Sequence, residues 1–282
     1  MKVTFVARIL GELRKVKRCC SNFGFLSGLR IYFQLLCNVE KIYIGANKKL
    51  PNWDGYLYFR KGSTDKYVFD QVFLNLEYRL PSFPQSRSLI QRYEELIKSN
   101  KSPLIVDCGA NTGFSSIFFK LLFPNATILA IEPNSDNFRI LLKNLGGIKD
   151  LNTIQGAVYS ETKELKLIDP GKGQWGFRVQ EFAGQDRAES VQAFSMNDLL
   201  KEQLNTRPDM VPFICKIDIE GAEKQLFSEN TEWVNLFKLI TIEIHDRQIP
   251  NQGISAPFFR TCAFLNRDIL FQGENVFSFA SN

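Results

Sequence analysis

An acidic residue and a glycine-containing turn follow a short apolar run near the middle of the chain. The run Leu104-Ile105-Val106 is typical of a buried parallel strand, and residues 107–113 (Asp-Cys-Gly-Ala-Asn-Thr-Gly) are typical of a tight turn. A helix-like run over 114–123 follows directly. Such junctions bind nucleotide-like ligands because backbone N–H groups and the helix dipole converge there. The sequence therefore predicts a small-molecule site at this turn.

The glycine spacing indicates which kind of nucleotide-like ligand the turn suits. A dinucleotide site requires the pattern G-x-G-x-x-G. Counting from Gly109, the second and third glycine places hold Asn111 and Phe114. The glycine that lets backbone approach a pyrophosphate is therefore missing, as is the one that allows close helix–strand packing. The turn is suited to a ligand without a diphosphate.

A second carboxylate lies where a ribose would need it. Residues 126–131 are typical of another buried strand, which ends at Glu132, nineteen residues after Gly113. An acid at the tip of the second strand can accept hydrogen bonds from both ribose hydroxyls. With Asp107 to accept from a ligand amine, these positions describe a site for S-adenosylmethionine. The predicted cofactor-binding residues are Asp107, Gly109, Ala110, Asn111, Gly113, Glu132, Pro133, Asn134, Gly156, Ala157 and Asp218.

Three stretches of the chain carry a family resemblance. Residues 105–113, 131–133 and 215–223 (Cys-Lys-Ile-Asp-Ile-Glu-Gly-Ala-Glu) resemble the signature of FkbM-type S-adenosylmethionine-dependent methyltransferases. An upstream block at 59–65, with 68–69 and 77–78, resembles the segment that precedes the cofactor domain in that family. The resemblance covers roughly residues 55–250 and implies O-methylation, often of sugars in glycans or natural products. It does not specify the acceptor.

Candidate acceptor contacts come from two regions. The upstream block supplies Arg60, Asp65 and Tyr78. A loop over 169–176 follows the third predicted strand on the side where substrates enter such folds, and it carries Trp175 between glycines. Trp175 is suited to stack on a sugar face, although a tryptophan there can equally anchor the loop.

Methyl transfer to an alcohol requires a positioned base, because an alcohol is a weak acid. Candidates lie at the tips of the fourth predicted strand (213–219), which supplies Asp218 and Glu220, and the fifth (239–244). Strand alternation places Glu243 and His245 on one face. We predict His245 as the base, Asp218 as the group that orients acceptor or cofactor, and Glu220 as a further catalytic residue. The alternative for His245 is a purely structural histidine.

No metal ion is predicted as part of this site. One histidine and six cysteines without a C-x-x-C pair exclude a histidine- or cysteine-rich zinc site. Asp218, Glu243 and His245 offer ligands for a divalent ion, and this alternative stays open. Lys216 and Asp218 share a strand face, which also fits a buried ion pair.

Charge is concentrated at the beginning of the chain. Residues 1–30 contain seven basic residues and one acidic residue, a net charge of +6, whereas the 282-residue chain carries +5 in total. The remainder is near neutral, which argues against a nucleic-acid substrate. Residues 5–16 also have helical apolar periodicity, and a basic amphipathic helix suits either an anionic membrane surface or a partner protein. The absence of a signal-peptide pattern and the unpatterned cysteines favour a cytoplasmic protein, with membrane association as an option.

Strands and helices alternate from residue 101 onward, as a doubly wound α/β sheet requires. We predict a Rossmann-like class I methyltransferase sheet, mostly parallel, closed by an antiparallel hairpin at 268–272 and 275–279. The predicted segments are a basic helical extension (1–45), a β-hairpin with helices (46–100) and the cofactor domain (101–282). Two other function classes stay open: an NAD-dependent oxidoreductase, and a non-catalytic scaffold that kept the fold.

Overall fold

A computed structural model describes residues 2–45, 54–80, 82–169, 171, 176–181 and 189–281, with side chains from residue 10 onward. The chain forms two compact units, Met1–Glu77 and Tyr78–Asn282. The sequence predicted boundaries after residues 45 and 100. The first adjoins residues 46–53, which lie outside the described residues, and the helix before residue 101 belongs to the second unit.

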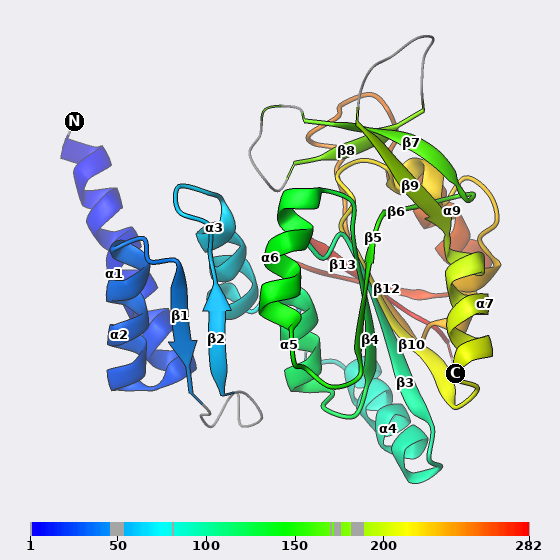
Figure 1. The fold of residues 1–282 in the computed structure, drawn as a ribbon, viewed down its shortest axis with the longest axis horizontal. Coiled ribbons are helices and arrows are strands. Elements are labelled where there is room, and N and C mark those ends of the chain that lie inside the picture. Colours follow the sequence, from blue (N-terminus) through cyan, green and yellow to red (C-terminus); the bar gives the residue numbers. More distant parts are fainter. Residues whose placement is uncertain are drawn as a thin grey trace. The chain divides into compact units, whose positions relative to one another are not determined.

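The first unit contains two helices, a short hairpin and a further helical segment (Figure 1). Helices α1 (Lys2–Phe23) and α2 (Phe25–Leu36) are separated at Gly24. Strand β1 (Lys41–Ile44) pairs antiparallel with β2 (Gly55–Tyr58). Helix α3 (Asp65–Phe69) continues into the π-helix η1 (Asp70–Asn75). The helical segment ends where Leu76 adopts a left-handed conformation.

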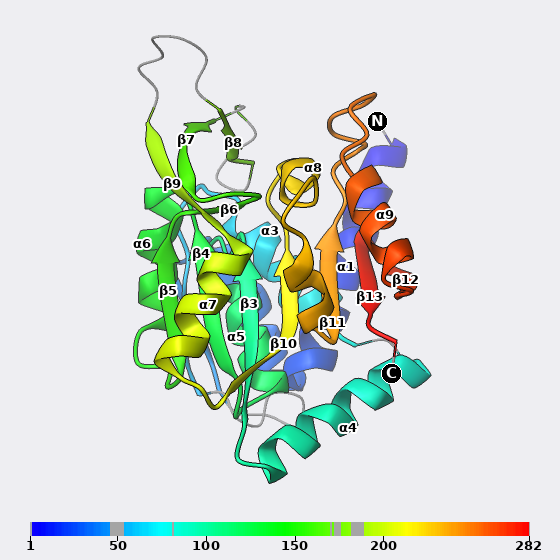
Figure 2. The same cartoon turned by 90° about the vertical axis from the view of Figure 1, so that its right-hand side faces the viewer.

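Seven of the described strands in the second unit form one sheet, which Figure 2 shows edge to edge. Their order is β12-β13-β11-β10-β3-β4-β5, and every pairing from β11 to β5 is parallel. The hairpin β12–β13 closes the sheet antiparallel, so the predicted fold class is confirmed. The strands are β3 (Ser102–Cys108), β4 (Thr127–Glu132), β5 (Leu151–Gln155), β10 (Met210–Ile217), β11 (Leu239–Glu243), β12 (Asp268–Gln272) and β13 (Asn275–Phe279).

Helices cover both faces of this sheet. Figure 1 shows α5 (Phe114–Leu122) and α6 (Ser135–Leu145) on one face, and α7 (Met196–Thr206) and α9 (Ala256–Phe264) on the other. The remaining helices are α4 (Pro84–Lys98), the short α8 (Glu223–Leu226) and the 3-10 helix η2 (Glu232–Leu236). This three-layer arrangement is that of a doubly wound fold.

A smaller sheet diverges from the large one after β5. Its order is β6-β9-β7-β8, with bounds β6 (Ala157–Tyr159), β7 (Lys163–Ile168), β8 (Arg178–Gln180) and β9 (Ser190–Ser195). The third predicted strand is divided into β5 and β6, because the chain changes sheets at Gly156. A side chain there would lie 2.7 Å from the Gln192 carbonyl oxygen, so only glycine allows this close crossing.

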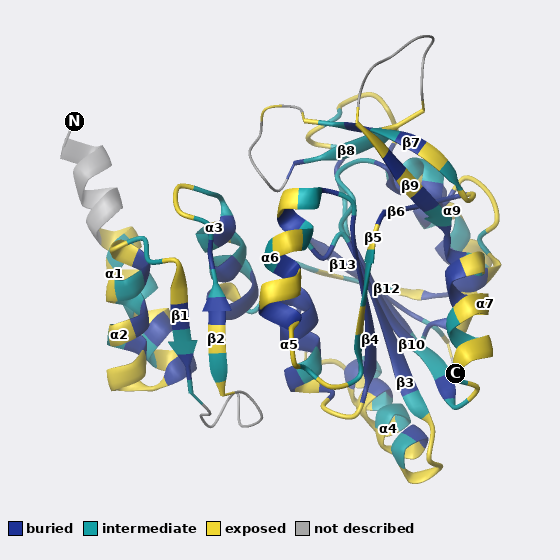
Figure 3. Cartoon of the chain, viewed as in Figure 1, coloured by how far each residue is buried: buried dark blue, intermediate teal, exposed yellow. Residues whose placement is uncertain are grey.

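The centre of the large sheet is dark blue, meaning buried, in Figure 3. Leu104, Ile105 and Val106 of β3 are fully buried, as a central parallel strand requires. Burial of each such side chain contributes about 1.5–3 kcal/mol. Because β3, β4, β10 and β11 are parallel, their carboxyl ends meet at one edge, and the predicted site residues follow these ends.

Two further sequence features can be compared with the structure. All six cysteines are free thiols, of which Cys19, Cys108, Cys215 and Cys262 are buried. Among the described helices, none combines the length and apolarity needed to span a bilayer.

Candidate functional site

The glycine turn after β3 lies between the ends of β4 and β10. Gly109 has φ +76°, and a side chain at this position would lie 1.8 Å from the carbonyl oxygen of Asp218. Only glycine fits both the left-handed backbone and this close approach. The amides of Gly109 and Ala110 both donate to the Ile131 carbonyl, at 3.0 and 2.9 Å. The turn is therefore fixed against both neighbouring strands.

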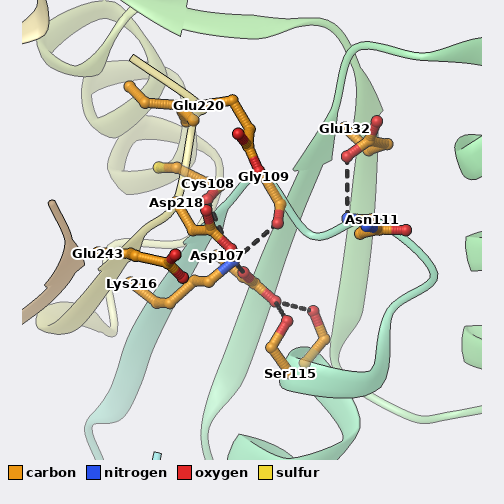
Figure 4. A network of polar contacts seen from close by, with 12 residues as sticks. Asp107, Cys108, Gly109, Asn111, Ser115, Glu132, Lys216, Asp218, Glu220 and Glu243 are labelled. Carbon is orange, nitrogen blue, oxygen red and sulfur yellow. Dashed lines mark hydrogen bonds and ion pairs between the residues drawn. The ribbon is translucent and has the colours of Figure 1, made fainter. Parts of the chain in front are cut away.

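Lys216 of β10 ties the underside of this turn to the sheet (Figure 4). Its side chain is 2 % exposed, and its Nζ donates to the Gly109 carbonyl at 2.7 Å. The same Nζ lies 3.3 Å from Asp107 and 3.6 Å from Asp218. The ion pair that shared strand faces predicted for Lys216 and Asp218 is thus present. A buried cation shared by two acids and a carbonyl holds the turn rigid.

Asp107 is fully buried and its carboxylate is already engaged. One oxygen accepts hydrogen bonds from the hydroxyls of Ser115 and Ser116, each at 2.6 Å, and the other faces Lys216. Figure 4 shows the side chain directed toward the first turn of α5. Direct acceptance from a ligand amine stays a prediction. In the structure, Asp107 joins the turn to α5 and β10.

Glu132 lies on the other side of the turn at the end of β4 (Figure 4). One oxygen accepts from the Asn111 amide at 2.9 Å, and the other accepts from the Asn134 amide and the Asn137 side chain, both at 3.0 Å. Burial raises the pKa of this carboxyl above its ordinary value. Each carboxylate oxygen has two lone pairs, so one acceptor position remains, on Oε2, for a ribose hydroxyl.

Acidic side chains gather around His245 at the ends of β10 and β11. The Nε2 atom of His245 lies 3.7 Å from a carboxylate oxygen of each of Asp218, Glu220 and Glu243. The Nδ1 atom bonds Glu223 of α8 at 2.8 Å. His245 and Glu223 are fully buried, whereas the Asp218 side chain is 26 % exposed. Figure 4 shows Asp218, Glu220 and Glu243 on the side of Gly109 away from Glu132.

The charges of this cluster alter its pKa values strongly. Burial alone would lower the pKa of His245, but the hydrogen bond to Glu223 and the charges of Asp218 and Glu220 raise it to about 10. Burial and the charge of Asp218 raise the pKa of Glu220 to about 7 and that of Glu243 to about 8. The sequence predicted an imidazole that is deprotonated near neutral pH. With these neighbours His245 instead keeps its proton there.

The backbone between β10 and α8 is unusual. Glu220 has φ +54° and Gly221 has φ +107°. A left-handed conformation is uncommon for a non-glycine residue and costs about 1–3 kcal/mol, which functional sites often tolerate. This turn directs Glu220 toward the Nε2 atom of His245.

Comparison with known proteins places the chain in a family. The model of the Methyltransferase FkbM domain matches residues 107–271, more than half of the chain. The chain belongs to the FkbM methyltransferase family. The methyltransferase sdnD of Sordaria araneosa is 23 % identical over 193 residues, covering 57 % of this chain and 67 % of that protein.

Solved structures give more distant likenesses. A precorrin-6y C5,15-methyltransferase from Geobacter metallireducens is 12 % identical with a TM-score of 0.36, over 72 % of this chain and 92 % of the other. The N-terminal domain of human METTL16, solved in complex with SAH, is 10 % identical with a TM-score of 0.36, over 71 % and 72 % of the two chains.

The family assignment answers one question that the sequence left open. FkbM proteins are methyltransferases with S-adenosylmethionine as cofactor, which excludes the alternative of an NAD-dependent oxidoreductase. The glycine turn and Glu132 are the residues of this FkbM domain suited to hold that cofactor. A turn that lacks the diphosphate glycines agrees with a cofactor that has no diphosphate.

The other predicted cofactor residues lie close to these two. Pro133 and Asn134 follow β4, and the Asn134 side chain caps α6 by accepting from the amides of residues 136 and 137. Gly156 donates its amide to the Glu132 carbonyl at 3.1 Å, and Ala157 begins β6. The structure thus brings these residues together at the carboxyl edge of the sheet. Their contacts with cofactor stay a prediction.

The predicted acceptor residues are more scattered along the FkbM methyltransferase chain. Arg60 and Asp65 belong to the first unit and pair with each other, the guanidinium Nη2 lying 2.6 Å from the carboxylate. Tyr78 is buried in the second unit, where the Lys216 Nζ lies 5.9 Å from its ring centroid. Trp175 lies outside the described residues. Asp65 is the first residue of α3, and its carboxylate accepts a hydrogen bond from the Arg60 side chain.

Several important side chains were missing from the predicted site. Glu223 was assigned only to a first helical turn, yet it holds His245 through a contact between residues 22 positions apart. Ser115 and Ser116 hold Asp107. The pair of serines at the start of an apolar helix was the available signal, because hydroxyls there need a buried acceptor.

Proposed function

We propose that this FkbM methyltransferase transfers the methyl group of S-adenosylmethionine to a hydroxyl oxygen of a sugar, in a glycan or a related natural product. The observation that supports this proposal is the contact between Gly109 and the Asp218 carbonyl. It brings the acid cluster beside the turn predicted to hold the cofactor. An acceptor bound to the cluster would then lie next to the reactive methyl group.

Methyl transfer from a sulfonium is an in-line displacement. The acceptor oxygen attacks the methyl carbon, the carbon–sulfur bond breaks, and the acceptor loses its proton. Alignment of oxygen, carbon and sulfur supplies much of the rate enhancement. Side chains of this chain can fix that alignment because carboxylates accept hydrogen bonds from hydroxyl groups. Neighbouring sugar hydroxyls would suit the several acids around His245.

Asp218 is the member of the cluster that we assign to the acceptor hydroxyl. Its side chain is more exposed than those of Glu220 and Glu243, which are 17 % and 16 % exposed. It also adjoins Gly109, whereas His245 is fully buried and holds its proton near neutral pH. His245 thus acts as a positioning residue, and the role of base that its sequence position predicted passes to the acids.

A screen with labelled cofactor tests the proposal. The 282-residue chain is incubated with methyl-labelled S-adenosylmethionine and a panel of sugars, and the product's linkage is determined by mass spectrometry. We expect label on a sugar oxygen. Asp218→Asn keeps the shape and should reduce turnover by about 10²–10⁴-fold. Glu202→Gln, an exposed change on α7, should leave turnover unaltered.

Two results would contradict the proposal. Label found on nitrogen or carbon of the acceptor would exclude O-methylation. If the chain binds cofactor but transfers no methyl group to any acceptor of the panel, and Asp218→Asn gives the same result, the protein is a non-catalytic scaffold.

A further inference from the structure

The Nε2 atom of His245 is a buried polar atom without a hydrogen-bond partner among the described residues. The His245 side chain is fully buried, and this nitrogen faces the carboxylates of Asp218, Glu220 and Glu243 at 3.7 Å each. That distance is too long for a hydrogen bond. Buried polar atoms in folded proteins are nearly always satisfied, so a missing partner at this point is indicated.

Glu223 determines which nitrogen of the imidazole faces the acids with a lone pair. A carboxylate only accepts hydrogen bonds, so Nδ1 must be the donor across the 2.8 Å contact. A cation that binds at Nε2 would displace the proton from this nitrogen and take up its lone pair, while Nδ1–H keeps its bond to Glu223. Carboxylates that hold the second nitrogen in this way commonly orient histidines that bind metal ions.

The spacing of the potential ligand atoms fits a single ion. One atom each from Asp218, Glu220 and His245 lies within 4.8 Å of the others. Ligand oxygens lie about 2.0–2.6 Å from Mg²⁺ or Ca²⁺, so two ligands of one ion can be up to about 5 Å apart. Glu243 adds a third carboxylate at the same distance from Nε2. Glu243 is not part of that group of three, so its side chain would have to move closer to bind the same ion.

The charges around His245 also favour a bound cation. Asp218, Glu220, Glu223 and Glu243 place four carboxylates around the imidazole. The nearby cations are Lys216, 3.6 Å from Asp218, and Arg178, whose charge acts on Glu220. Lys216 also pairs with Asp107, 3.3 Å away, so five carboxylates share these two cations, and negative charge remains unbalanced even beside a protonated imidazole. A divalent cation would balance them, whereas buried charges left unpaired are costly.

We propose that Asp218, Glu220, Glu243 and His245 bind a divalent cation, with Glu223 as the residue that positions the imidazole. Carboxylates suit Mg²⁺, Ca²⁺ and Mn²⁺, and imidazole is a ligand of transition metals, so Mn²⁺ meets both requirements and is the appropriate probe. The existence of the site is independent of the methylated acceptor. Its use rests on the proposed function: an acceptor hydroxyl bound to the ion loses its proton more readily.

Titration with Mn²⁺ alone tests the site. Free Mn²⁺ is followed by electron paramagnetic resonance during addition to the full chain, with neither methyl donor nor acceptor present. We expect one saturable site per chain. Asp218→Asn and Glu220→Gln should each weaken binding at least tenfold, and Glu223→Gln about 10–100-fold. Glu202→Gln, which removes an exposed charge on α7, should bind as the unaltered chain does. Far-ultraviolet circular dichroism verifies that each variant is folded.

The outcomes separate this inference from the proposed function. Absence of saturable Mn²⁺ binding, or equal binding by Asp218→Asn, Glu220→Gln and the unaltered chain, would overturn the metal site. Methyl transfer that persists without bound metal would leave the proposed function intact and remove the metal's role. Mn²⁺ binding without transfer to any sugar would support the site and contradict the function.

Discussion

Individual residues in this protein are constrained by more than one neighbour at once. Glu132 is the clearest case, because its carboxylate accepts two backbone amides and one side-chain amide while remaining the predicted ribose ligand. Gly109 combines a left-handed backbone with a close approach to β10. A substitution at either position can therefore change both ligand binding and stability, and the two effects must be measured separately.

Glu132→Gln should weaken cofactor binding without unfolding the domain. Both carboxylate oxygens face backbone N–H donors, so the amide group of glutamine would oppose one of them. Loss of charge-assisted bonds to the ribose should cost roughly 1.5–3 kcal/mol per bond. Calorimetric titration with S-adenosylhomocysteine measures the change, and melting temperature serves as the control for folding. Unaltered affinity would contradict the assignment of Glu132.

Gly109→Ala should destabilise the protein more than a matched glycine replacement. Gly273→Ala also places a side chain on a left-handed backbone, φ +62°, but meets nothing within 4 Å. It should therefore cost only the backbone penalty of about 1–2 kcal/mol. Gly109→Ala adds a steric clash with the Asp218 carbonyl. Urea denaturation should therefore show a larger decrease in the free energy of unfolding for this variant. If both variants lose the same free energy of unfolding, the structure accommodates the new side chain at position 109 without additional cost.

At the scale of elements, the sheet could be predicted because its signals are local. The hairpin at 268–272 and 275–279 consists of two short apolar runs separated at Gly273, and both strands match their predicted bounds. The predicted pairing of 213–219 with 239–244 was also correct. The change of sheet at Gly156 could not be predicted, because the Gln192 carbonyl that forces it lies on a distant strand.

The candidate site was predictable to a smaller extent than the sheet. The strand tips gave Asp218, Glu220 and His245, but not their mutual distances or protonation. The contact between Glu223 and His245 depends on the left-handed turn at Glu220 and Gly221, which sequence spacing does not encode. The resulting charge density is what raises the pKa of His245.

Lys216 connects β10 to the end of β3, so its replacement should destabilise the packing of both strands. Lys216→Met leaves Asp107 buried with only two hydroxyl partners. Breaking one side of a buried ion pair costs about 3–5 kcal/mol. Chemical denaturation should show a loss of this size, and adding Asp107→Asn should restore part of it. If Lys216→Met alone lowers the free energy of unfolding by less than about 1 kcal/mol, the ion pair does not stabilise the contact between the two strands.

For the whole molecule, the division into two units gives a better place to cut the chain than its charge does. A cut near Glu40 would separate the basic residues 1–30 from the near-neutral remainder of the chain. However, Asn22 of α1 donates to the carbonyls of Phe73 and Leu74, and Lys15 pairs with Asp70. A cut at residue 40 would expose these η1 partners. A chain that starts at Tyr78 should fold and bind S-adenosylhomocysteine, whereas one that starts at Glu40 should aggregate.

The basic first unit also predicts an association that the catalytic unit would lack. Exposed apolar side chains of α2 include Phe25 and Leu26, 71 % and 80 % exposed, and Arg14 and Lys17 of α1 are exposed. Apolar burial in the headgroup region and about 1 kcal/mol per basic residue near anionic lipid together favour membrane attachment.

We therefore expect the full chain to sediment with phosphatidylserine vesicles at low salt and to dissociate as salt is raised, since screening weakens surface attraction. The chain from Tyr78 onward should stay in solution. Arg14→Glu with Lys17→Glu should reduce binding, whereas Lys149→Glu with Lys201→Glu, the same charge change in the second unit, should not. If neutral vesicles bind equally well, apolar contact alone is responsible. If no vesicle binds, the unit instead serves to dock a partner protein, because its exposed apolar and basic side chains would still need a surface to cover them.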